Sequence, residues 1–259
     1  MSSYGIILCY IPPDPYDFES VEFMVCHRKD SLWYSEFLRG HLEDEKLEYY
    51  LQFITSKEKQ NLINYCEEKL TFQELWYDMT MSNKESKYYF KCKEYIESLK
   101  DRLQVCLTKI ENNTDTYVEF PKGRKNYDEE GIYTALREFV EESKIGPSYV
   151  NIIDIRPIVY DYTGTDGKCY TNHYYLALTT KKVRPHCIEH KSKLRRYIVS
   201  NEVSRIEWKK FSDCCKIMDE TLMIKLKYIF ETYNSMFKDG NIKFKRKPYI
   251  QSLRSGKSK

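Results

Sequence analysis

The stretch from Phe120 to Ile145 decides how this chain is interpreted, and it reads FPKGRKNYDEEGIYTALREFVEESKI. Five residues separate Gly123 from Glu129, and seven more precede Arg137. The second half has the apolar spacing of an amphipathic helix. The apolar side of this helix is formed by Ile132, Ala135, Leu136, Phe139 and Val140. The stretch therefore predicts a loop that leads into a helix with one buried side.

Three carboxylates occupy the other side of this predicted helix. Glu138, Glu141 and Glu142 stand at positions i, i+3 and i+4, so their side chains share one face. Three like charges this close destabilise a helix and raise their own pKa values unless something compensates them. A hard dication with oxygen ligands, Mg²⁺ or Mn²⁺, would do so. We also expect Arg137 to pair with Glu129 across the loop. A solvated acidic helix is the alternative, but it does not account for the full pattern.

The pattern resembles the Nudix box, GX5EX7REUXEEXGU, at every position except the late glycine, where this chain has Lys144. The resemblance implies an α/β/α sandwich with a mixed sheet and hydrolysis of a pyrophosphate linkage by metal-activated water. It implies that the ligands of Mg²⁺ or Mn²⁺ are Glu138, Glu141 and Glu142, one of which would serve as general base. It also places Arg137 and Glu129 among the catalytic residues, and Lys122 and Gly123 in a substrate loop.

A further acidic residue often precedes the Nudix strand that ends in tryptophan. In the segment NEVSRIEW, which ends at Trp208, Glu202 is the candidate for this catalytic role. An exposed strand residue with no role is the alternative, because a single exposed acid is ordinary.

Two further stretches narrow the substrate class. The box opens with Phe-Pro-Lys-Gly at 120–123, as in decapping and dinucleoside-polyphosphate Nudix enzymes. Residues 25–38, VCHRKDSLWYSEFL, resemble the segment before the helical insertion in the mRNA-decapping enzymes of poxviruses and African swine fever virus. This resemblance implies cleavage of m⁷GpppN-RNA to m⁷GDP and 5′-monophosphate RNA, in a viral protein that acts in the host cytoplasm and shuts off host expression. A diphosphoinositol or dinucleoside polyphosphate substrate is the alternative, and a catalytically dead binding module is another.

Periodicity divides the chain into an α/β body with an insertion. We expect a Nudix domain at 1–30 and 112–240, a helical insertion at 31–111 and a basic tail at 241–259. Strands are predicted at 4–11, 20–28, 117–120, 149–159, 171–180 and 203–208. Helices are predicted from an N-cap at Thr55 or Ser56 through Leu70, continuously over 88–110, and over 219–237. The aromatic residues of the insertion are expected to form its core.

Basic residues are concentrated in two segments, although the net charge is only +3. From Lys238 to Lys259, eight basic residues face Asp239 alone, a net of +7 that leaves −4 for the rest of the chain. Residues 181–196 form the second segment. A polyanionic partner and a solubilising role explain such segments equally well. The candidate RNA-binding residues are Lys84, Lys87, Lys91, Lys100, Arg102, Lys245, Arg246 and Lys247. The cap guanine would stack on an aromatic ring, for which Trp33 and Tyr34 are the first candidates.

Nine scattered cysteines predict free thiols, most of them small hydrophobic side chains, and not a disulfide framework. The sequence His186-Cys187-x-x-His190 has metal-like spacing but no second ligand pair, so a basic exposed loop is preferred to a zinc site. No apolar run is long enough to cross a membrane, and the N-terminus has no secretory pattern, so a cytoplasmic protein is expected. The sequence does not indicate an oligomeric state.

Overall fold

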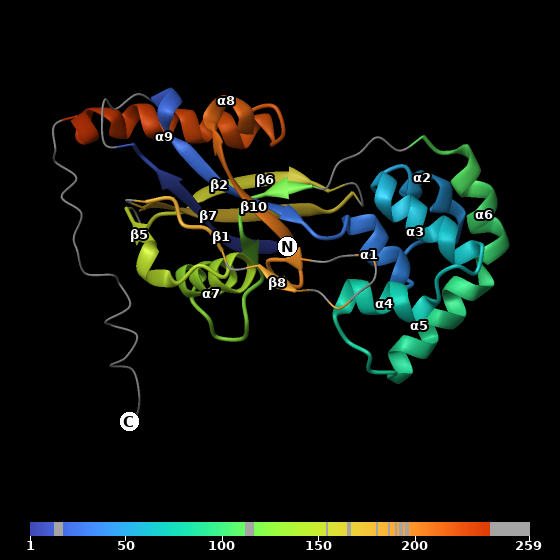
Figure 1. Ribbon diagram of the computed structural model, residues 1–259. Helices are drawn as coiled ribbons and strands as arrows, with labels where there is room; N and C mark the ends of the chain where they lie inside the picture. Colours follow the sequence, from blue (N-terminus) through green and yellow to red (C-terminus); the bar gives the residue numbers. More distant parts are fainter. Residues whose placement is uncertain are drawn as a thin grey trace. The chain divides into compact units, whose positions relative to one another are not determined.

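The computed structural model describes residues 1–12, 18–111, 117–153, 155–164, 167–179, 181–185, 187–189, 191, 194 and 197–238. The chain divides into two compact units (Figure 1). The α/β unit contains Met1–His27, Val118–His186 and Arg205–Lys259, and the helical unit contains Arg28–Tyr117 and Cys187–Ser204. The helical unit is thus larger than the predicted insertion at 31–111, because residues 187–204 join it. The predicted tail at 241–259 lies outside the described residues.

The α/β unit is built on one mixed sheet, which has eight strands within the described residues. Its strands are β1 (Ser2–Tyr10), β2 (Glu22–Arg28), β3 (Val118–Glu119), β4 (Lys122–Gly123), β5 (Asn151–Ile152), β6 (Ile158–Thr163), β7 (Cys169–Thr179) and β10 (Val203–Lys210). The order is β10-β2-β1-β7-β5, with β3 on β2, β4 on β1 and β6 on β7. The two long central strands, β1 and β7, run parallel from Ser2↔Thr171 to Tyr10↔Thr179. β1 is antiparallel to β2 and β4.

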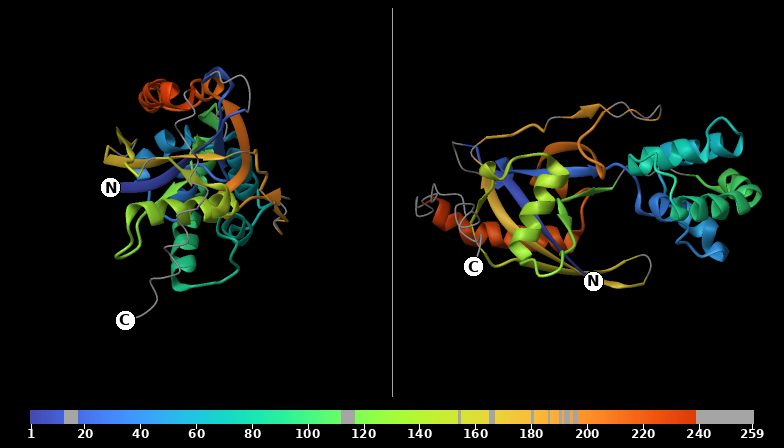
Figure 2. Two further views of the ribbon diagram at one scale, coloured as in Figure 1. Left: turned by 90° about the vertical axis from the view of Figure 1, so that its left-hand side faces the viewer. Right: turned by 90° about the horizontal axis from the view of Figure 1, so that it is seen from below.

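Helices cover both faces of this sheet. Helix α7 (Gly131–Ser143) lies on one face, while α8 (Phe211–Cys214) and α9 (Glu220–Lys238) lie on the other (Figure 1). Seen from below, α7 crosses in front of the sheet and α9 lies behind it (Figure 2). Two 3₁₀ turns, Phe18–Ser20 and Pro147–Tyr149, complete the unit. The predicted α/β/α sandwich with a mixed sheet is confirmed.

The central strands are apolar on both faces because helices cover both. In β1, residues 5–9 are all buried, and alternate side chains point to opposite faces. Ile7 and Cys9 join the cluster that includes Leu226 and Phe230 of α9. The intervening residues face the side on which α7 packs, where Phe139 is fully buried. This packing fixes α7, and with it the acidic face, against the middle of the sheet.

The helical unit contains six helices within the described residues. They are α1 (Leu32–Leu38), α2 (Leu47–Leu51), α3 (Ser56–Cys66), α4 (Phe72–Thr80), α5 (Lys87–Ser98) and α6 (Lys100–Lys109), with a 3₁₀ turn at Asp44–Lys46 and a hairpin of β8 (Ile188–Glu189) and β9 (Tyr197–Ile198). Thr55 caps α3 and Thr71 caps α4, each in a capping box with the acid three residues later.

The aromatic residues of the insertion form its core, as predicted. Trp33 stacks on Tyr50 with ring centroids 4.6 Å apart, and Phe72, Trp76 and Tyr89 pack together. Trp33 is 8% exposed and Tyr34 is fully buried. The prediction that these two residues stack on a cap guanine is therefore wrong, because the same apolar character that suggested them places them inside the helical unit.

Two predicted elements are interrupted in the structure. The expected continuous helix over 88–110 is two helices, because Leu99 ends α5 and begins α6. The expected strand over 149–159 is only the short strand β5, followed by β6 from Ile158. The last helix and the long strand β7 agree with prediction within two residues at each end.

The cysteines are free thiols, as expected, and six of the nine are buried. Cys187 is exposed, while His186 and His190 lie outside the described residues, so the predicted exposed loop is described at Cys187 only. Among the helices of the described residues, none has the length and apolar character needed to span a bilayer.

Candidate active site

Helix α7 presents the acidic face predicted from the sequence. It begins at Gly131, where a side chain would collide with the ring of Tyr4 and the hydroxyl of Tyr175, so glycine allows the helix to approach the sheet closely. It ends at Lys144, which has a left-handed conformation with φ of 56°. The late glycine of the Nudix pattern would adopt this conformation without strain. Lys144 therefore ends α7 in the same left-handed backbone conformation that a glycine would adopt at this position.

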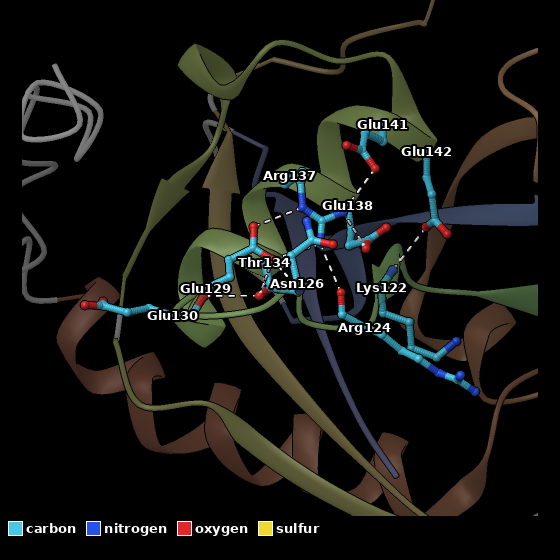
Figure 3. A network of polar contacts seen from close by, with 10 residues as sticks. All are labelled: Lys122, Arg124, Asn126, Glu129, Glu130, Thr134, Arg137, Glu138, Glu141 and Glu142. Carbon is cyan, nitrogen blue, oxygen red and sulfur yellow. Dashed lines mark hydrogen bonds and ion pairs between the residues drawn. The ribbon is translucent and has the colours of Figure 1, made fainter. Parts of the chain in front are cut away.

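Arg137 and Glu129 form the predicted pair, and it is bidentate (Figure 3). The Nε and Nη2 atoms of Arg137 each donate to one carboxylate oxygen of Glu129, both at 2.9 Å. The hydroxyl of Thr134 and the backbone N–H of Asn126 also donate to this carboxylate. The hydrogen bonds from Arg137 are the largest cause that lowers the pKa of Glu129 to about 2, so Glu129 stays ionised.

The same arginine ties the loop to the helix. Its Nη2 atom donates to the backbone carbonyl of Arg124 at 3.0 Å, and Glu129 holds the backbone of Asn126. The backbone of the loop between Gly123 and α7 is thus held at Arg124 by Arg137 and at Asn126 by Glu129.

The three carboxylates of the acidic face do not point to one spot (Figure 3). Glu138 and Glu141 accept hydrogen bonds from the same atom, Nη1 of Arg137, at 2.7 and 3.2 Å. Glu142 instead accepts from the backbone N–H of Lys122 at 3.1 Å. Among the described residues, no three acidic, histidine or cysteine side chains form a group ready to hold a metal ion. In this structure Arg137 supplies the charge that compensates Glu138 and Glu141, and the binding of a cation by the three glutamates stays a prediction.

The donor set nevertheless fits a hard dication. Five carboxylates, of Glu119, Glu129, Glu138, Glu141 and Glu142, lie in this network with the cations of Arg137 and Lys122. Carboxylates outnumber cations among these contacts, and carboxylate oxygens are the ligands that Mg²⁺ and Mn²⁺ prefer. The side chain of Glu141 is 56% exposed, so at least one carboxylate is open to solvent.

Lys122 and Gly123, predicted as a substrate loop, instead form the short strand β4, paired with β1 through Gly5↔Lys122 and Tyr4↔Gly123. The ammonium group of Lys122 pairs with Glu119. A side chain at Gly123 would collide with the carboxyl group of Glu138, so this glycine lets that carboxylate lie against the strand.

Of the other predicted residues, Glu202 and the basic candidates between Lys84 and Arg102 belong to the helical unit. Glu202 is exposed in the turn before β10, and its backbone carbonyl accepts a hydrogen bond from Lys29. Lys84, Lys87 and Lys91 are exposed at the start of α5. Lys100 pairs with Glu68, and Arg102 reaches the carbonyl of Glu45. The tail candidates Lys245, Arg246 and Lys247 lie outside the described residues. The structure therefore groups the box residues within the α/β unit, whereas Glu202 and the described basic candidates belong to the other unit.

Sequence reasoning missed an open pocket of about 440 Å³ in the α/β unit. It is lined by Met1, Ser2, Tyr4, Arg124 and Lys125. Tyr4 belongs to a strand that reads as apolar core, so its position offered no signal. Arg124 and Lys125 directly follow Gly123 and could have been identified as solvent-facing cations of the same loop.

The site thus joins a carboxylate-rich helix to a glycine-containing strand of the mixed sheet. No protein-family model matches the chain. The chain is 27% identical over 184 residues to a protein of Acanthamoeba polyphaga mimivirus described as "Putative mRNA-decapping protein". That match covers 60% of this chain and 51% of that protein, so the chain spans about half the length of this relative.

Two crystal structures of C. elegans Ap4A hydrolase also match. The binary complex has a TM-score of 0.43 at 12% identity and covers 89% of this chain and 98% of that chain. The other structure has a TM-score of 0.42 at 11% identity and covers 89% of this chain and 96% of that chain.

Proposed function

We propose that this protein is a divalent-metal-dependent Nudix hydrolase that removes the cap of mRNA, converting m⁷GpppN-RNA to m⁷GDP and 5′-monophosphate RNA. One observation carries the proposal: Glu138, Glu141 and Glu142 stand on one face of α7, beside Gly123 and the Arg137–Glu129 pair. Such a set of carboxylates suits hydrolysis of a phosphoanhydride, in which negative charge builds up on phosphoryl oxygens.

In this proposal Glu138, Glu141 and Glu142 hold Mg²⁺ or Mn²⁺. The cation, when bound, would neutralise phosphoryl charge and lower the pKa of the attacking water. One of the three glutamates accepts the proton of that water. Arg137 is the residue that keeps Glu138 and Glu141 together before the metal arrives, since both accept from its Nη1 atom. Glu129 holds Arg137 in turn and acts as a positioning residue.

The choice of capped RNA as substrate is supported by two observations. The mimivirus relative is described as a decapping protein, over the half of its length that this chain matches. The chain also has two basic segments on an otherwise acidic body, as a polyanion-binding protein would. The proposed activity would take place in the cytoplasm, where mRNA is translated.

The direct test is product analysis with RNA labelled in the cap, in the presence of Mg²⁺ and of Mn²⁺. Release of labelled m⁷GDP is expected, and Glu141→Gln should abolish it. Glu94→Gln, which neutralises an exposed acid of α5 in the helical unit, is the matched control and should retain activity. Undiminished turnover by Glu141→Gln would show that the activity does not arise from α7.

A second measurement separates capped RNA from small polyphosphates. Uncapped RNA should inhibit an enzyme that binds the RNA body, whereas it should not inhibit hydrolysis of free dinucleoside or diphosphoinositol polyphosphates by an enzyme built for them. If long capped RNA remains intact while free polyphosphates are cleaved, the decapping proposal is wrong and the hydrolase proposal stands. If neither substrate is cleaved, a binding module is the remaining function.

A further inference from the structure

The pocket beside the candidate active site combines two cations with an aromatic stack. Tyr4 and His173 stack with ring centroids 4.7 Å apart and planes 11° from parallel. The ammonium group of Lys125 lies 5.1 Å from the centroid of the Tyr4 ring. Both rings are only half-buried, and Arg124 and Lys125 are exposed. Burial, the largest cause, lowers the pKa of His173, so the stack is uncharged at neutral pH.

Neither of the two cations of this pocket forms an ion pair with an acid of the described residues, although Asp161 acts electrostatically on His173. The guanidinium of Arg124 contacts the thioether sulfur of Met1 at 3.5 Å, which is a weak acceptor. Within the part of the chain that the structure describes, neither Arg124 nor Lys125 forms an ion pair with a carboxylate. This differs from Arg137 and Lys122, whose charges are directed at acids of the same site. Two cations without an acidic partner, beside the half-buried ring of Tyr4, suit a ligand that carries both phosphates and bases.

The strand register places this pocket next to the acidic face. Tyr4 pairs with Gly123 on one side and with His173 on the other. Gly123 in turn lies against the carboxyl group of Glu138. The backbone of Arg124 is bound to Arg137, so its side chain leaves a fixed point. A ligand in the pocket would therefore be one strand away from the carboxylates of α7.

We propose that this pocket binds the first nucleotides of the RNA body, with Arg124 and Lys125 on phosphates and a base stacked on the Tyr4–His173 pair. The inference rests on the proposed function and adds which part of the substrate lies here. The positive charge of the pocket favours a nucleotide of the RNA body over the cap as the group that binds here. Phosphates are attached to both, but the 7-methylguanine ring of the cap carries a positive charge that Arg124 and Lys125 would repel, whereas the base of an internal nucleotide is neutral.

The test measures binding without cleavage, using a short 5′-monophosphorylated RNA labelled at its 3′ end and fluorescence anisotropy. The double substitution Arg124→Ala with Lys125→Ala should weaken binding and reduce the slope of log affinity against log salt by about 1.4, for two phosphates on a single strand. Tyr4→Leu should weaken binding by about fivefold or more, while Tyr4→Phe, which keeps the ring, should not. A matched control is Lys216→Ala with Lys227→Ala, which removes two exposed cations around α8 and α9. This control should leave both affinity and slope unchanged.

Wild-type affinity and slope in the Arg124–Lys125 double variant would overturn the inference. Displacement of the labelled RNA from the wild type by m⁷GDP as readily as by unlabelled RNA would also overturn it, because the pocket would then belong to the cap. The proposed function fails separately: if the wild type binds the RNA through Arg124 and Lys125 but releases no m⁷GDP from capped RNA, decapping is wrong and the pocket assignment stands.

Discussion

Gly123 determines where the carboxylate of Glu138 can lie. The space that a side chain would need at this position is occupied by the Glu138 carboxyl group. Because that group is the end of a flexible side chain, it can move away when a methyl group is introduced. Glycine is thus required here by the position of a functional group, and the backbone conformation does not demand it.

Gly123→Ala should reduce kcat by about a hundredfold, because displacing a catalytic group by about 1 Å has an effect of that size. The free energy of unfolding should change by less than about 1 kcal/mol, since most surface substitutions have small effects. Steady-state kinetics and urea unfolding would check the two parts. Gly146→Ala is the control, because the nearest atom to a Cβ at that position is 3.8 Å away. Equal kinetics in both variants would show that the position of Glu138 does not matter for the reaction.

The carboxylate of Glu207, on β10, makes the stability of the protein depend on pH in the acid range. Glu207 pairs with Lys209, His27 and Arg205 at 2.7, 3.1 and 3.3 Å. The hydrogen bond from Lys209 is the largest cause that lowers the pKa of Glu207 from 4.5 to about 2. Folding therefore favours the ionised form. The stability that Glu207 contributes is fully present above its ordinary pKa and is lost as pH falls through the range from 4.5 to about 2.

Glu207→Gln should accordingly lower the free energy of unfolding at neutral pH and have a diminishing effect as the solution is acidified. Because the carboxylate is 31% exposed, the neutral-pH loss should be about 1 kcal/mol. Urea unfolding of both proteins across the acid range measures the difference. A difference that stays constant with pH would mean that Glu207 acts through packing and not through its charge.

Side-chain contacts that depend on spacing along the sequence were predicted, and those that depend on how side chains pack in three dimensions were missed. The Arg137–Glu129 pair was predictable because both identities are fixed within one short pattern. The use of Arg137 as a shared donor for Glu138 and Glu141 was not predictable, because it depends on side-chain rotamers. Burial of Trp33 was missed because an aromatic residue suits a core and a binding surface equally well.

The capping boxes of α3 and α4 have the same local hydrogen bonds, but only the one in α3 also connects two helices. In α4, Glu74 accepts a hydrogen bond from the backbone of Thr71 at the exposed start of the helix. In α3, Glu58 accepts from the backbone of Thr55 at 2.8 Å and also from the backbone of Ser31 at 2.6 Å. Ser31 is the N-cap of α1, so the buried carboxylate of Glu58 joins two helices.

Glu58→Ala should therefore destabilise the helical unit by about 3 kcal/mol, because it leaves two buried backbone donors without their acceptor. Glu74→Ala, the matched control, should cost only about 1 kcal/mol, as expected for an exposed cap. Tryptophan fluorescence during urea unfolding reports on this unit when it is measured in a Trp208→Phe background, since the other two tryptophans, Trp33 and Trp76, both lie within it. Equal losses in the two variants would contradict the joining role of Glu58.

Helices and strands were predicted most accurately where one hydrophobic periodicity continues along the whole element. β7 and α9 follow their patterns over most of their length. The break between α5 and α6 was missed because Leu99 is buried at the position that a continuous helix would also bury, and neither glycine nor proline marks it. The membership of residues 187–204 in the helical unit was not predictable, because it arises from contacts between segments far apart in the sequence.

For the molecule as a whole, charge is separated along the chain. The tail from residue 238 carries +7 and the rest carries −4, so a polyanion would be attracted mainly to particular segments. The structure distinguishes among the predicted RNA-binding residues of the helical unit. Lys100 is already paired with Glu68 at 3.1 Å and lies over the ring of Tyr65, whereas Lys84 and Lys87 are exposed.

The difference between paired and exposed basic residues should appear in how strongly kcat/KM for capped RNA depends on salt concentration. Changing Lys245, Arg246 and Lys247 to alanine should reduce the slope of log(kcat/KM) for capped RNA against log salt by about 2, because three contacts to single-stranded phosphates are lost. Changing Lys84, Lys87 and Lys91 should have an effect of the same size. Changing Lys100 and Arg102 should have a smaller effect, since each already binds an acceptor within the helical unit. Hydrolysis of a small dinucleoside polyphosphate should be unaffected in every variant. Unchanged slopes in both triple variants would mean that these basic residues serve solubility, because a cation that binds a phosphate must release a counterion when it does so.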